Sequence, residues 1–144
     1  MPEYSISPTG ERFQLPEQKD YSKEFARLRE AVNHQRALKR EIVLVMGVGF
    51  VGAVMAAVVA DVEDGNGNST KFVIGMQRPS TRSYWKIPTI NQGISPINTE
   101  DPEVALMISR CVNEKKTLTA TFTYEALKLA DVVIVDVQCD YLKE

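Results

Sequence analysis

Cysteine and histidine are scarce in this chain of 144 residues, which contains two cysteines and one histidine. Cys111 and Cys139 lie too far apart in the sequence to indicate a disulfide framework or a zinc site. His34 has no second histidine or group of carboxylates at ligand spacing. We therefore expect no metal site, and the low cysteine content favours a reducing, cytoplasmic environment.

The chain also lacks an excess of positive charge and a long apolar run. Its formal net charge is −2, so no overall positive field attracts nucleic acid or an anionic membrane surface. The longest apolar stretches, at 42–46 and 50–60, fall short of the about 20 residues that span a bilayer. With 44% hydrophobic and 25% charged residues, the composition is typical of one globular domain with a core.

Residues 1–40 are expected to form an arm that precedes the main domain at 41–144. Three prolines disfavour a helix over 1–19 and predict an extended or mobile leader. From Asp20 to Arg40, apolar residues recur at helical spacing among charged ones, which predicts an amphipathic helix. The partner of its apolar stripe is either the domain itself or a second subunit, which leaves a homo-oligomer open. The stripe consists of Phe25, Leu28, Val32 and Leu38.

Residues 41–144 alternate between short apolar runs and helical patterns. Three helices are predicted: one at 50–60, one that begins at Pro102 with Asp101 as its N-cap, and a short one with Thr123 as its N-cap. The stretch around Pro88 is expected to be irregular. This order predicts an α/β fold: a Rossmann-type parallel sheet with helices on both faces, incomplete or truncated, plus the N-terminal helical arm. The predicted strands are 41–46, 71–76, 117–121 and 131–137.

A glycine-rich turn joins the first strand of this domain to its first helix. In a dinucleotide-binding turn, the first glycine permits the tight bend, the second lets a pyrophosphate approach the backbone, and the third allows close helix packing. The helix that follows offers free amides and the positive end of its dipole to the phosphates. Because the motif leaves a strand and opens an apolar helix, we favour binding over mere packing. The turn consists of Gly47, Val48, Gly49, Phe50, Val51 and Gly52.

The position after the second strand of this domain decides which dinucleotide fits. An acidic residue there usually bonds the ribose hydroxyls and repels a 2′-phosphate, but this chain has Gln77. An amide bonds a hydroxyl without repelling phosphate, and Arg78 and Arg82 follow closely. The residues therefore favour NAD and leave NADP open, and the alternative is that the two arginines belong to a solvated basic loop.

Two further features of the chain have alternative interpretations. Cys139 follows a predicted strand on the ligand side of the sheet, but Asp136 and Asp140 beside it would raise its pKa, so we interpret it as unreactive. Cys111 is interpreted as a packing residue. Tyr84 and Trp85 either stack on adenine or, as we favour, anchor their loop to the core.

Several motifs between residues 41 and 138 resemble the N-terminal domain of the UDP-glucose/GDP-mannose dehydrogenase family. Residues 45–52, Val-Met-Gly-Val-Gly-Phe-Val-Gly, are similar to that family's strand and turn. Residues 90–97, Ile-Asn-Gln-Gly-Ile-Ser-Pro-Ile, resemble its more specific Leu-Asn-x-Gly-x-Ser-Pro-Ile segment. Residues 118–134 follow its third strand, helix and fourth strand. The family's acid after the second strand corresponds to Gln77, and the basic residue a few positions later is retained as Arg82. Its Pro-Thr-Pro after the fourth strand is replaced by Val137-Gln-Cys-Asp140.

The resemblance implies the cofactor-holding part of an NAD-dependent nucleotide-sugar dehydrogenase. Members of the family oxidise the C6 alcohol of a nucleotide sugar to a carboxylate through a cysteine-bound intermediate. Their catalytic cysteine and sugar-nucleotide site lie in later domains, so the resemblance implies no catalytic residue in this chain and a fragment or truncated member. The competing hypothesis is a non-catalytic dinucleotide-binding module whose 20–40 helix docks a partner.

Overall fold

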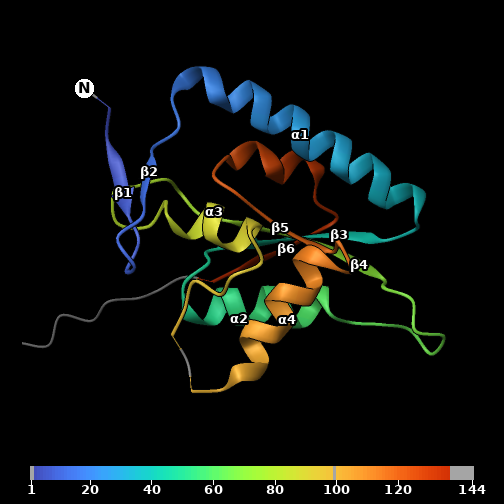
Figure 1. Cartoon of the computed structure of the whole chain (residues 1–144). Helices are drawn as coiled ribbons and strands as arrows, with labels where there is room; N and C mark the ends of the chain where they lie inside the picture. The colour runs from blue at the N-terminus through green and yellow to red at the C-terminus, as the bar shows by residue number, and fades with distance from the viewer. Residues whose placement is uncertain (1, 99, 137–144) are drawn as a thin grey trace, which may run out of the picture.

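A four-stranded parallel sheet forms the centre of the computed structural model, which describes residues 2–98 and 100–136. Its strand order is β5-β4-β3-β6 (Figure 1). The chain runs from β3 outward to β4 and β5 and then returns to place β6 on the other side of β3. This confirms the predicted Rossmann-type sheet. The strands are β3 (Glu41–Met46), β4 (Lys71–Met76), β5 (Leu118–Thr121) and β6 (Val132–Val135).

Both faces of the sheet are covered, which explains the apolar runs without alternation in its central strands. In β3, Val43 and Val45 pack into one hydrophobic cluster, whereas Ile42 and Leu44 pack into a second cluster on the opposite face. All four side chains are at most 3% exposed. Because successive side chains of a strand point to opposite faces, a strand buried on both sides needs apolar residues throughout.

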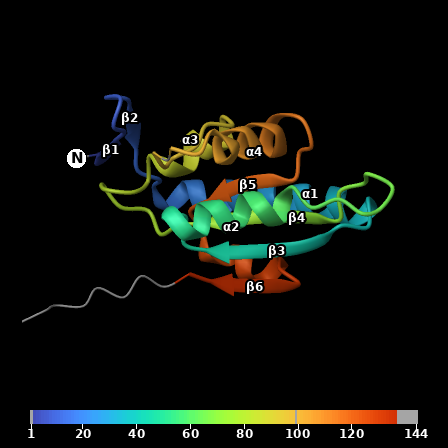
Figure 2. The same cartoon turned by 90° about the horizontal axis from the view of Figure 1, so that it is seen from below.

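Helices α2 (Phe50–Ala60), α3 (Lys86–Asn91) and α4 (Pro102–Asn113) cover the first face. Figure 2, seen from below, shows α2 lying in front of the sheet and running alongside the strands, and its buried alanines permit close packing on β4. The predicted cap of α4 is present, because Asp101 accepts a hydrogen bond from the Glu103 amide at 2.9 Å. The stretch around Pro88, which was expected to be irregular, forms helix α3 instead. Pro88 is the third residue of this helix, and proline is tolerated in a first turn because the backbone amides there have no acceptor within the helix.

Helix α1 (Gln18–Ala37) and the 3₁₀ helix η1 (Tyr124–Leu129) cover the opposite face (Figure 1). Leu28 and Val32 of α1 are at most 1% exposed and pack in the same cluster as Ile42 and Leu44. The partner of the predicted stripe is therefore the sheet of this same chain. Leu38 lies beyond the helix and is 49% exposed, so its assignment to the stripe was wrong.

Most of the leader predicted over 1–19 is non-helical and contains a small antiparallel hairpin of β1 (Tyr4–Ile6) and β2 (Arg12–Gln14), but its last two residues, Gln18 and Lys19, already belong to α1. Gly10, with φ +93°, lies in the hairpin turn. The hairpin is tied to the start of α3, because the Trp85 amide donates to the buried Ser5 hydroxyl at 3.0 Å. None of the helices in the described ranges combines the length and apolarity needed to cross a membrane.

Strand β5 lies at an edge of the sheet, and a side chain takes the place of a neighbouring strand there. The Asn91 side chain accepts a hydrogen bond from the Ala120 amide at 2.8 Å and donates one to the Ala120 carbonyl at 3.1 Å. Arg27 of α1 donates to the same carbonyl at 3.1 Å. Blocking an edge strand in this way protects it from pairing with other chains.

We expect Asn91→Ala to destabilise the domain by about 2 kcal/mol, because the amide of the fully buried Ala120 loses its acceptor. Urea unfolding followed by circular dichroism measures the change. Asn113→Ala removes an amide side chain from the end of α4 and is the comparison variant. Equal stability of Asn91→Ala and the unmodified chain would contradict this role.

Candidate functional site

The carboxyl edge of the sheet contains a topological switch point between β3 and β6. From β3 the chain crosses to β4 on one side, and β6 pairs with β3 on the other side. Ligands of open α/β sheets bind at this point, outside the carboxyl ends of the strands. The glycine turn at 47–52 leaves β3 here and opens α2.

Two of the three glycines in the turn are required by the fold itself. Gly47 has φ +101°, and a Cβ on it would lie 2.8 Å from the carbonyl oxygen of Asp136. A Cβ on Gly52 would overlap the Gly47 carbonyl oxygen. The Gly47 amide donates to the Met76 carbonyl at 2.7 Å, which fixes the turn over the end of β4.

Gly49 is different, because no atom of the described residues lies close to the position that its Cβ would take. It is the N-cap of α2, and a Cβ on it would meet no heavy atom within 4 Å. Phe50 and Val51 are 57% and 54% exposed. Among the described residues, none accepts a hydrogen bond from the amides of Gly49, Phe50 or Val51. Free amides at a helix N-terminus with open space before them suit an anion.

Val48 connects the turn to Gln77. The Val48 side chain is 1% exposed and packs over β4, where a Cβ on Gly75 would lie 3.0 Å from Val48 Cγ1. The Val48 amide donates to Gln77 Oε1 at 3.1 Å. The structure thus brings the predicted turn and the residue after β4 together, and only the backbone of Val48 faces the site.

Arg78 and Arg82 lie in the exposed loop between β4 and α3. Two serines of this loop share a hydrogen bond of 2.7 Å, and Trp85 Nε1 donates to the Arg82 carbonyl at 2.9 Å, so the loop backbone is held in place. Within the described part of the chain, neither guanidinium forms an ion pair. Among the interactions of the described residues, no hydrogen bond or ion pair joins either arginine side chain to the glycine turn.

Tyr84 anchors the same loop to the core. Its ring packs edge-on against Phe122 with a centroid distance of 6.0 Å, and Tyr21 of α1 packs on Phe122 at 5.1 Å. Burial raises the pKa of the Tyr84 hydroxyl. The anchoring interpretation therefore holds for Tyr84.

The remaining reactive side chains lie away from the turn. Cys111 is buried between α2 and α4, where burial raises the pKa of its thiol, in keeping with a packing residue. Cys139 lies outside the described residues. His34 is exposed on α1, and the described residues contain no group of three or more ligand side chains suited to a metal ion.

Asp136 is a site residue that sequence reasoning did not assign. It directly follows β6, and its amide donates to the Met46 carbonyl at 3.0 Å. Its Oδ2 lies 3.1 Å from the position that a Gly52 Cβ would take, so a carboxylate lies beside the turn. Asp136 could have been identified from the sequence by its position directly after the strand that flanks the switch point.

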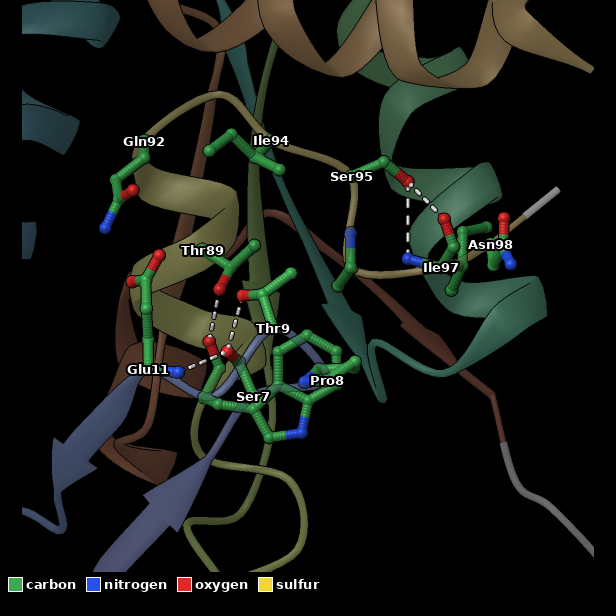
Figure 3. Close-up of a pocket in the computed structure, with 12 residues that line it drawn as sticks. Ser7, Pro8, Thr9, Glu11, Thr89, Gln92, Ile94, Ser95, Ile97 and Asn98 are labelled. Atoms are coloured by element: carbon green, nitrogen blue, oxygen red, sulfur yellow. Dashed lines mark hydrogen bonds between the residues drawn. The ribbon is translucent and has the colours of Figure 1, made fainter.

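A separate hollow of about 380 Å³ lies between the N-terminal hairpin and the loop after α3 (Figure 3). The family-like segment at 90–97 forms one wall, with Gln92, Ser95 and Ile97 among its lining residues. Ser7 and Thr9 of the hairpin turn, whose hydroxyls share a 3.0 Å hydrogen bond, form the other wall. This segment therefore packs close to the arm that precedes the main domain.

The solved structures similar to this chain include the crystal structure of NDP-N-acetyl-D-galactosaminuronic acid dehydrogenase from Methanosarcina mazei Go1. The TM-score is 0.63 at 25% sequence identity, and the match covers 80% of this chain. This chain spans 22% of the length of that dehydrogenase. No protein-family model and no curated protein matches the sequence.

Proposed function

We propose that this chain, whose resemblance to the nucleotide-sugar dehydrogenase family the structural match confirms, binds NAD through the glycine turn at 47–52. The open space and free amides at Gly49 carry the proposal, because they lie at the switch point where a pyrophosphate fits. The amides of Gly49, Phe50 and Val51 bind the pyrophosphate oxygens. Gln77 bonds the adenosine ribose, with Arg78 and Arg82 nearby in the same loop.

The reaction we propose for the whole enzyme is oxidation of the C6 alcohol of a UDP- or GDP-sugar to the uronate in the cytoplasm. NAD accepts hydride in this chemistry, and the present chain binds and orients it. Gln77, after β4, would hold the adenosine ribose, and Asp136, after β6, lies on the other side of the glycine turn, where it would face the nicotinamide half of a bound dinucleotide. The nucleophilic cysteine and the sugar-nucleotide site are supplied from outside the described residues.

Isothermal titration of the 144-residue chain with NAD tests the binding step. We expect one site per chain with a Kd below about 1 mM, which corresponds to about −4 kcal/mol. A matching increase in Tm with NAD concentration would support binding to the folded state. If neither NAD nor NADP bound at millimolar concentration, the proposed function would be wrong.

A further inference from the structure

The hydrogen bond between the glycine turn and Gln77 fixes the orientation of the Gln77 side-chain amide. The Val48 amide is a donor, so the Gln77 atom that faces it at 3.1 Å must be the acceptor Oε1. The Nε2 group forms no hydrogen bond with another described residue, so this end of the side chain can donate to a ligand. Gln77 therefore presents two N–H donors at the end of β4.

A donor at this position changes which ribose substituent fits. A carboxylate accepts hydrogen bonds from the 2′-hydroxyl and repels a 2′-phosphate. An NH₂ group donates equally well to a hydroxyl oxygen and to a phosphate oxygen, and it carries no negative charge. The carboxylate that normally excludes NADP is therefore replaced at position 77 by an uncharged amide.

The loop that follows Gln77 also supplies positive charge. Arg78 and Arg82 are exposed, and neither guanidinium is neutralised by an ion pair in the described ranges. Guanidinium groups bind phosphate oxygens with a matching fork geometry. A 2′-phosphate placed beside Gln77 would meet no acidic residue among residues 77–85.

From the orientation of the Gln77 amide and the two arginines of its loop, which form no ion pair with another described residue, we propose that this site accepts NADP about as well as NAD. The inference rests on the proposed function, because it concerns the adenosine ribose of the same bound dinucleotide. Gln77 is in this view the residue that sets cofactor specificity.

The test measures the Kd values of NAD and NADP for the unmodified chain and for Gln77→Glu. Glutamate is nearly isosteric, and one of its oxygens keeps the bond from the Val48 amide while the other replaces the outward Nε2. We expect the two Kd values of the unmodified chain to agree within about 10-fold. Gln77→Glu should raise the ratio of the NADP Kd to the NAD Kd at least about 10-fold, because a carboxylate repels a 2′-phosphate and accepts hydrogen bonds from the ribose hydroxyls.

Two further variants separate the local effect from a change in net charge. Asn33→Asp makes the same change of charge on an exposed position of α1 and should leave both Kd values unchanged. Arg78→Ala should weaken NADP binding and leave NAD binding within about 3-fold. NAD binding that is more than about 10-fold tighter than NADP binding in the unmodified chain would overturn this inference and leave the proposed function intact. Equal weakening of both cofactors by Gln77→Glu would also overturn it, and no binding of either would refute both proposals.

Discussion

Replacing Gly52 by alanine is expected to weaken dinucleotide binding at least about 100-fold and to destabilise the domain by about 2 kcal/mol. The added Cβ would overlap the carbonyl oxygen of Gly47 and would approach Asp136 Oδ2 at 3.1 Å. Backbone atoms do not rotate away as a side chain does, so the turn must open. When the turn opens, the backbone amides that are proposed to bind the pyrophosphate move out of position. Titration calorimetry gives the loss of affinity, and urea unfolding gives the loss of stability.

Gly49→Ala is the matched control, since it adds the same methyl group three residues earlier. This methyl group meets no heavy atom of residues 2–98 and 100–136 within 4 Å, and the φ of −70° suits alanine. Loss of a glycine N-cap and lower entropy of the unfolded chain act in opposite directions, so stability should change by less than about 1 kcal/mol. Binding should nevertheless weaken at least about 10-fold, because the methyl group occupies the space of the ligand.

The two variants together distinguish a packing turn from a binding turn. A packing role predicts that only Gly52→Ala has an effect and that this effect is on stability. A pyrophosphate site predicts loss of binding in both variants and loss of stability in one. Unchanged NAD affinity of Gly49→Ala would show that the pyrophosphate does not approach Gly49, whatever Gly52→Ala does.

The elements that sequence reasoning predicted well are those determined by local pattern. The apolar runs of β3 and β4, the capped start of α4 and the glycine turn after β3 all depend on neighbouring residues in the chain. Their order then restricts the sheet to a parallel one with crossovers, which the structure confirms.

The features that were missed depend on contacts between distant residues. The orientation of the Gln77 amide is set by Val48, 29 positions earlier in the sequence. The hairpin at the N-terminus is held by the contact of Ser5 with Trp85, 80 positions later. Asp136 reaches the glycine turn only because β6 pairs with β3. No short pattern encodes such pairings, so the chemical details of the site required the structure.

Replacing Asp61 by asparagine is expected to destabilise the domain by about 2 kcal/mol at pH 7 and to remove part of its acid sensitivity. Asp61 follows α2 and accepts hydrogen bonds from Arg110 Nε at 2.8 Å and Nη2 at 2.7 Å, and Lys115 Nζ lies 2.8 Å from Oδ1. These side chains are 19% to 33% exposed, so we expect less than the 3–5 kcal/mol of a fully buried pair. The network ties the end of α2 to α4 on the face opposite α1.

The pH dependence follows from the direction of the pKa shift of Asp61. The hydrogen bond from Arg110 is the main cause that holds the pKa of this carboxyl far below its ordinary value, and Lys115 adds to the effect. A carboxyl with a lowered pKa in the folded state contributes stability above its unfolded pKa of about 3.9 and loses that contribution as the pH falls. The unmodified chain should therefore lose stability between about pH 5 and pH 3, and Asp61→Asn should lose less.

Urea unfolding at several pH values between 3 and 7 measures both effects. Some acid sensitivity should remain in Asp61→Asn, because a hydrogen bond from Arg36 lowers the pKa of Asp131 as well. Glu30→Gln removes an exposed carboxylate of α1 that forms no ion pair in the described part of the chain, and should leave the pH profile unchanged. If Asp61→Asn kept the full slope of the unmodified chain between pH 5 and pH 3, the Asp61 network would not be a source of its acid sensitivity.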